Sequence, residues 1–176
     1  MLRQSLTYQL ASIADDAIGQ ASLVFKRRFG LDVHELRVLR LIDDEPGISF
    51  TDLAKKTRFE RSATSRILSR LVKNGLAKRK IDGDDARRFL FFSTAKARAL
   101  RADVDPISLE LEALVLSPLR EEERRQFLTV LNKIADWLKG DAALKEMQRL
   151  YPDSRPADKT PAANRGKRPR GETAAS

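Results

Sequence analysis

The sequence predicts a mainly α-helical protein that carries one two-stranded β-hairpin. Apolar residues recur at three- or four-residue steps over most of residues 4–140, which is the period of helices with one apolar face. Two short segments, 77–81 and 88–92, break this period and flank a turn-forming loop at 82–87. With 176 residues, of which 41% are hydrophobic, the chain is long enough to bury one compact core.

Capping signals divide the N-terminal part of the chain into helices. The first helix is expected over about 4–29, with Gly30 as its C-terminal stop. Asp32 and Glu35 have the spacing of a capping pair that opens a second helix, which ends at Pro46-Gly47. The apolar face of the first helix consists of Leu6, Leu10, Ile13, Ala17, Ala21 and Val24.

The middle of the chain predicts two short helices, a tight turn and then the hairpin. Ser49 opens the third helix, and a turn at 57–59 leads to a fourth helix over 61–74, which Gly75 ends. Two short helices joined by a tight turn, followed by a hairpin with a charged loop, form a winged helix-turn-helix. We therefore expect residues 31–94 to form a lobe of this kind, with the hairpin as its β-wing.

Two further helices follow the hairpin. Thr94 caps a long helix that contains Pro106, and Ser117-Pro118 is expected to open the last helix because proline suits a first helical turn. The apolar faces of these helices and of the first one exceed what a small lobe can cover. We therefore expect residues 1–30 and 95–140 to form a dimerisation region. The face of the last helix consists of Phe127, Leu131, Ile134 and Leu138.

Positive charge is concentrated in the middle of the chain. Residues 49–101 hold 15 Lys and Arg against 5 Asp and Glu, whereas residues 1–48 hold 6 against 7 and residues 102–151 hold 7 against 10. A basic segment between two acidic ones is typical of a lobe that binds a polyanion. Residues 152–176 hold 6 against 3, with four of the seven prolines, which predicts a disordered basic tail.

The fourth helix and the hairpin loop supply the residues expected to contact double-stranded DNA. Hydroxyls on the outward face of the helix can contact phosphates or base edges, and arginines can fork onto guanine. In the loop, Asp85 is expected to orient the guanidinium of Arg87 toward the minor groove. A turn whose acids only bind backbone amides is the simpler interpretation, and both roles can hold at once. The expected DNA-binding residues are Arg61, Ser62, Thr64, Ser65, Arg66, Arg70, Asp85, Arg87 and Arg88.

Other functional classes lack their sequence signatures. The chain has no cysteine and one histidine, which leaves little material for a metal or catalytic cluster. It contains no glycine-rich phosphate loop or nucleophile motif, so we expect neither an enzyme nor a bound cofactor. The N-terminal stretch carries charges where a signal peptide has an apolar run, and no apolar stretch approaches bilayer length. We expect a soluble, cytoplasmic protein with no membrane partner.

The chain resembles the MarR family of bacterial transcription regulators over about residues 6–140. The runs that carry the resemblance are LDVHELRVLRLI, ISFTDLAKKTRFERSATSRILSRLVKNGLAKR and DGDDARRFLFFSTAKARAL. The resemblance implies a homodimer that represses genes near its own. It places Ser62, Thr64, Ser65 and Arg66 at the family's major-groove positions, and Arg87 at the wing tip with Asp85 as its partner.

The resemblance also implies an effector, since small aromatic or phenolic acids often release family members from DNA. Such ligands lodge between the dimer helices and the DNA lobe, where Tyr8 and His34 are the residues expected to line a pocket. We therefore expect a repressor released from a pseudo-palindromic operator by a small aromatic or heteroaromatic carboxylate. A constitutive DNA-binding regulator without an effector is the alternative.

Overall fold

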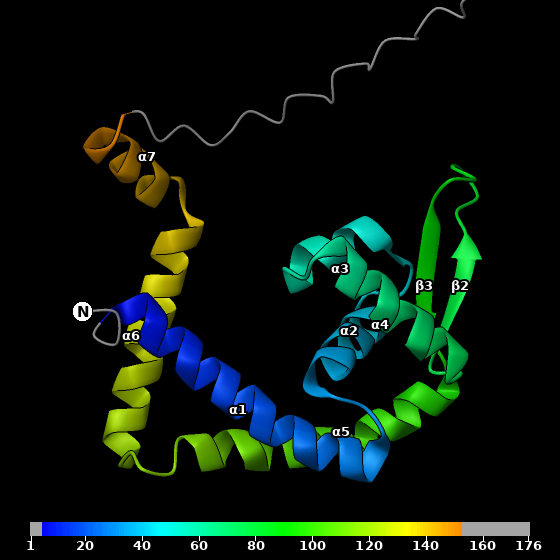
Figure 1. Cartoon of the computed structure of the whole chain (residues 1–176), viewed down its shortest axis with the longest axis horizontal. Helices are drawn as coiled ribbons and strands as arrows, with labels where there is room; N and C mark the ends of the chain where they lie inside the picture. The colour runs from blue at the N-terminus through cyan, green and yellow to red at the C-terminus, as the bar shows by residue number, and fades with distance from the viewer. Residues whose placement is uncertain (1–4, 153–176) are drawn as a thin grey trace, which may run out of the picture. The chain divides into compact units, whose positions relative to one another are not determined.

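The computed structural model describes residues 5–152, in which the chain forms two compact units that divide between Pro118 and Leu119. The first unit contains the helices α1 (Leu6–Phe29), α2 (Val33–Asp44), α3 (Phe50–Thr57), α4 (Arg61–Lys73) and α5 (Ala95–Val115), and the strands β1 (Ile48–Ser49), β2 (Ala77–Ile81) and β3 (Phe89–Ser93) (Figure 1). The second contains α6 (Glu121–Lys139) and α7 (Asp141–Leu150). The predicted mainly helical, winged helix-turn-helix fold is confirmed.

Capping interactions set the helix boundaries of the first unit where the sequence predicts them. Asp32 accepts a hydrogen bond from the amide of Glu35 at 2.9 Å, and the Glu35 carboxylate accepts one from the amide of Asp32 at 2.8 Å. Ser49 and Thr94 accept the corresponding amide hydrogen bonds at the starts of α3 and α5. Gly30 ends α1 with a φ of 71°, in the left-handed region that glycine adopts without strain.

The strands form one antiparallel sheet in the order β1-β3-β2. The pair β2–β3 is the predicted hairpin, in register from Ala77 opposite Ser93 to Ile81 opposite Phe89. The sequence did not predict β1, because a strand of two residues is too short to show an alternating pattern. Since α3 begins at the next residue, β1 holds the start of α3 against the hairpin.

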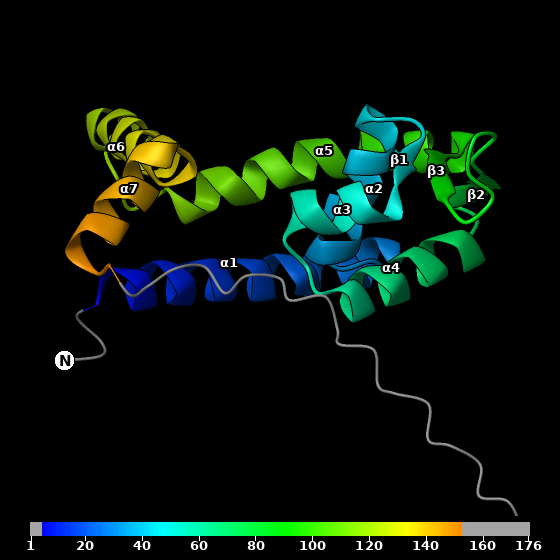
Figure 2. The same cartoon turned by 90° about the horizontal axis from the view of Figure 1, so that it is seen from above.

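The helices and strands of the lobe each bury one face in the core of the first unit. Figures 1 and 2 show α2, α3 and α4 grouped beside the hairpin, with the C-terminal part of α1 and the start of α5 next to them. The most deeply buried side chains are Leu31, Val38, Ile42, Leu53, Leu71 and Val104. The earlier part of α1 contributes nothing to this core, and its apolar residues Leu6, Leu10 and Ile13 are exposed.

A polar network joins α2 to α5 and to the end of the hairpin. Arg101 on α5 pairs with Asp43 and Asp105 at 3.0 Å, and Arg40 on α2 pairs with Asp105 at 2.8 Å. Ser93 at the end of β3 donates to Asp43 at 2.5 Å. Partial burial alone would raise the pKa of Asp105, but the hydrogen bonds from Arg40 and Arg101 outweigh it and lower the pKa.

The first helix of the second unit, α6, begins later than predicted, and a second helix, α7, was not predicted. The predicted helix start at Ser117-Pro118 is wrong, because the Ser117 amide bonds to the Leu114 carbonyl at 3.0 Å and still belongs to the end of α5. α6 begins at Glu121, where Glu123 accepts from the amide of the cap residue Arg120 at 2.8 Å. α7 follows directly and was not predicted.

None of the helices within residues 5–152 is long and apolar enough to cross a membrane. Residues 153–176, nearly all of the predicted basic tail, lie outside the described residues.

Candidate nucleic-acid interface

α4 presents a polar and basic face to solvent. It packs on α2, α3 and β2, and its buried side chains include Leu68 and Leu71. No acidic residue occurs within the helix. The exposed side chains are those of Arg61, Ser62, Ser65, Arg66, Ser69, Arg70, Val72 and Lys73. Arg61, Ser62, Ser65 and Arg66 therefore lie on the outward face, as predicted.

Thr64 does not belong to this face. Its side chain is fully buried, and its hydroxyl donates to the Glu60 carbonyl at 3.1 Å. Residues 64, 68 and 71 lie four and three positions apart and share one side of a helix, so Thr64 faces the core with Leu68 and Leu71. The predicted DNA contact by Thr64 is wrong.

The guanidinium of Arg70 binds two groups of the same chain. Its Nε lies 3.1 Å from the carboxylate of Glu35, and its Nη2 donates to the Gly30 carbonyl at 3.1 Å. Glu35 is buried, and a buried carboxylate is stable only with a cation or hydrogen-bond donors beside it. Arg70 therefore fastens α4 to α2 and to the end of α1, a structural role that the sequence did not predict, while its side chain remains 52% exposed and its contact with DNA stays a prediction.

The aspartates of the hairpin loop bind backbone amides. Asp85 accepts from the amide of Arg87 at 3.0 Å, and Asp82 accepts from the amide of Asp84 at 3.2 Å. Within residues 5–152, the Asp85 carboxylate bonds to the Arg87 amide and makes no ion pair with the Arg87 guanidinium, so its orienting role toward DNA stays a prediction. The simpler interpretation, a turn stabilised by its own acids, describes this loop. The Arg87 side chain is left exposed.

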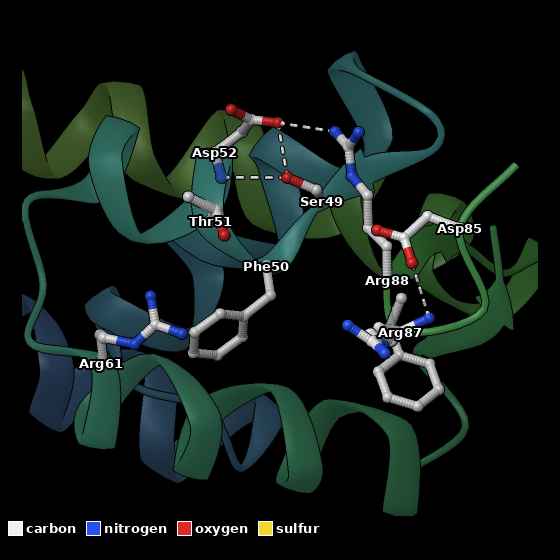
Figure 3. Close-up of a pocket in the computed structure, with 9 residues that line it drawn as sticks. Ser49, Phe50, Thr51, Asp52, Arg61, Asp85, Arg87 and Arg88 are labelled. Atoms are coloured by element: carbon white, nitrogen blue, oxygen red, sulfur yellow. Dashed lines mark hydrogen bonds and ion pairs between the residues drawn. The ribbon is translucent and has the colours of Figure 1, made fainter. Parts of the chain in front are cut away.

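Arg88 links the loop to the first turn of α3. Its guanidinium lies 3.5 Å from the carboxylate of Asp52 and 3.8 Å from that of Asp82. Figure 3 shows the Arg88 side chain reaching toward Asp52 while Asp52 also contacts Ser49. The sequence did not predict this structural role, and the side chain remains 52% exposed. Its contact with DNA stays a prediction.

A hollow of about 520 Å³ lies between the start of α3 and the hairpin loop (Figure 3). The guanidinium carbon of Arg61 lies 4.9 Å from the centre of the Phe50 ring, which fixes the arginine at the rim. The residues that line the hollow are Ser49, Phe50, Thr51, Asp52, Arg61, Asp85, Arg87, Arg88 and Phe89. The hollow joins the start of α4 to the hairpin loop in one surface with an excess of positive charge. Phe50 packs partly against the core and also lines this hollow, a position that local sequence patterns do not indicate.

The predicted ligand residues do not meet within one chain. The amide of Val33 donates to Ser22 at 3.3 Å, which places His34 beside the last third of α1. Tyr8 lies fourteen positions before Ser22, which is about 21 Å along a helix. One small acid therefore cannot touch both side chains in the same protomer. The His34 Nδ1 is buried without a partner among the described residues, and its ring lies 4.9 Å from that of Phe59.

The fold and this surface define a class. A helix-turn-helix whose second helix carries a basic face without acids, next to a hairpin loop with exposed arginine, is a winged helix-turn-helix DNA-binding protein. A sequence profile of the MarR family matches residues 29–88. The transcriptional regulator HosA of Escherichia coli is 26% identical over 131 residues, which cover 70% of this chain and 97% of HosA. The DNA-binding lobe of the chain therefore resembles the MarR family of transcription regulators in sequence.

Solved structures share the fold. BpsR of Bordetella bronchiseptica, whose DNA binding is regulated by 6-hydroxynicotinic acid, has a TM-score of 0.68 and 20% identity over 77% of this chain and 96% of its own. The MarR family protein Rv2887 of Mycobacterium tuberculosis, in complex with p-aminosalicylic acid, has a TM-score of 0.63 and 24% identity over 74% of this chain and 98% of its own.

We expect Arg70→Ala to destabilise the fold rather than only weaken DNA binding. The substitution leaves the buried Glu35 carboxylate without its cation, which we expect to lower the free energy of unfolding by about 1–3 kcal/mol. Urea denaturation measures this change. Glu35→Gln in the Arg70→Ala background should recover part of the loss, because a neutral amide needs no cation. If Arg70→Ala keeps wild-type stability and only DNA affinity falls, Arg70 is a DNA contact after all.

Proposed function

We propose that the protein is a homodimeric repressor that binds a pseudo-palindromic operator and is released by a small aromatic or heteroaromatic carboxylate. The observation that carries the proposal is the acid-free basic face of α4 beside the exposed Arg87 of the hairpin loop. In this proposal residues 31–94 bind DNA, and residues 1–30 and 95–140 hold two copies together. Such a regulator works in the cytoplasm, where bacterial chromosomal DNA lies.

The DNA contacts divide between the two parts of the surface. Arg66 and Ser65 lie on the exposed face of α4, from which an arginine can bind guanine O6 and N7 in the major groove. Ser62 lies one turn earlier and is suited to a phosphate or a base edge. Arg87 stands at the loop, from which it can reach the minor groove while Asp85 keeps the loop backbone in place.

The exposed apolar side chains of the terminal helices support a dimer. Leu6 and Ile13 on α1 are 58% and 60% exposed, and on α6 Trp137 and Leu138 are 50% and 55% exposed. Apolar stripes of this kind are expected to be covered by another surface. A second copy related by two-fold symmetry would cover them and present two α4 helices to successive turns of the major groove.

The proposed effector site includes His34 but not Tyr8 of the same chain. The His34 ring contacts Phe59, and the Arg37 guanidinium lies 5.7 Å from the centre of the Phe59 ring. Phe59 lies in the turn directly before α4, so an aromatic acid paired with Arg37 would act on the start of the DNA-reading helix. The ligands of BpsR and Rv2887 are both aromatic or heteroaromatic carboxylic acids, which supports this ligand class.

The first test is a DNA-binding selection from a random duplex library, followed by anisotropy titrations between 50 and 200 mM salt. We expect the wild type to enrich a pseudo-palindrome, and log affinity to fall with log salt by about 0.9 for each phosphate contacted. Arg66→Ala should cost roughly 1–3 kcal/mol on the selected site and change the preferred base. Lys73→Ala, which removes the same charge from the other end of α4, should weaken binding to all sequences evenly. A flat salt dependence contradicts the proposal.

A second prediction concerns the α1 stripe. Replacing both Leu10 and Ile13 with glutamate should convert the dimer to a monomer, because the charges would be buried in the proposed interface. Ala11→Glu places a charge on another side of α1 and is the matched control, which should remain dimeric. Light scattering measures the mass of each variant. A double variant that stays dimeric would locate the interface elsewhere.

A third prediction concerns the effector. p-Aminosalicylic acid or 6-hydroxynicotinic acid at a large excess over its Kd should raise the melting temperature, since a ligand that binds only the folded state stabilises it. The same acid should weaken operator binding. Arg37→Gln should reduce both responses without changing operator binding in the absence of ligand. If no aromatic acid changes the melting temperature or the DNA affinity, the protein is a constitutive regulator.

A further inference from the structure

The turn between α3 and α4 has a rigid frame. Thr57 is buried, and its hydroxyl donates at 2.7 Å to a carbonyl one turn earlier in α3. Thr64 is also buried, and its amide and hydroxyl both bond to the carbonyl of Glu60 at distances of 3.0 and 3.1 Å. Between them, Phe59 packs against the core. The backbone of the turn is therefore held at both ends and in the middle.

The two outward residues of this turn both depart from local preferences. Arg58 has a φ of 58°, and within residues 5–152 it is the one non-glycine residue with a positive φ. Glycine or asparagine is favoured in that region. Glu60 is the N-cap of α4 and makes no side-chain capping hydrogen bond, like the N-caps of α1 and α7, whereas α2, α3 and α5 begin with a capping Asp, Ser or Thr. Such departures from local stability rules are expected at functional sites.

Both side chains are exposed and unpaired. Across the described part of the chain, neither Arg58 nor Glu60 makes an ion pair or a side-chain hydrogen bond. They directly precede Arg61 and Ser62, at the end of α4 that reaches base edges when such a helix enters a major groove. A carboxylate at this place is repelled by the phosphates, so it is unfavourable unless it accepts a hydrogen bond from a base.

We propose that this turn belongs to the DNA-reading surface, in which Glu60 selects cytosine and Arg58 contacts a phosphate. This inference rests on the proposed binding of DNA through α4. Cytosine offers an amino donor in the major groove with no acceptor beside it, which suits a carboxylate. The amino group of adenine lies next to the N7 acceptor, which repels a carboxylate and favours an amide side chain instead. The charge of Arg58 offsets the repulsion between Glu60 and the backbone.

Selection from a random duplex library with the full chain tests the role of Glu60. The wild type should enrich cytosine at one position in each half-site, with about tenfold discrimination or more. Glu60→Gln, which keeps the shape of the side chain, should move the preference at that position to adenine, and Glu60→Ala should abolish it. Both variants should bind random DNA more tightly than the wild type, because one anion is removed.

Arg58→Gly tests the phosphate contact. It should raise the melting temperature by about 2–4 °C, because glycine takes a positive φ without strain. It should also make the salt slope shallower by about 0.9. Arg58→Lys keeps the charge and should leave the slope unchanged. An unchanged base preference in Glu60→Gln overturns the role of Glu60, and an unchanged slope in Arg58→Gly overturns that of Arg58. A wild type that enriches no sequence at all overturns the proposed function as well.

Discussion

One buried carboxylate, that of Glu35, determines how α4, the helix proposed to bind DNA, packs on the lobe. One of its oxygens accepts from the amide of Asp32, and the other pairs with Arg70, which also binds the carbonyl of Gly30. A carboxylate removed from water is stable only with such partners. The end of α1, the start of α2 and the last turn of α4 are therefore held together around one buried group.

The C-terminal end of α2 carries a second polar junction. Asp43 binds Arg101 of α5 and Ser93 of β3, and Arg40 binds Asp105 of α5. α2 is thus fixed to α4 at its start and to α5 and the hairpin at its end. α2 therefore connects the proposed dimerisation helices to the proposed DNA surface. Side chains packed and bonded along a helix make this connection more rigid than exposed loops would.

Local sequence signals were sufficient to predict the boundaries of most helices, but they did not predict the roles of individual side chains. The caps at Asp32, Ser49 and Thr94 bind amides three residues ahead, so sequence spacing alone reveals them. The partner of Arg70 lies 35 positions away, and nothing near position 70 indicates it. Thr64 was misplaced because a threonine is polar enough for a surface and small enough for a core, and only the phase of the helix decides. β1 exists only through its pairing with β3.

Because such ion pairs form between distant residues, the net charge of residues 49–101 overestimates the number of cations available to bind DNA. Four of the 15 Lys and Arg in residues 49–101, namely Lys56, Arg70, Arg88 and Arg101, form ion pairs with acids of the first unit. A cation that already has a carboxylate partner releases few counterions from DNA, because it must first give up that partner. The salt slope should therefore follow the exposed and unpaired cations, such as Arg58, Arg66 and Arg87, and not the total charge. The folded arrangement of charge, and not its total amount, therefore determines how strongly salt weakens DNA binding.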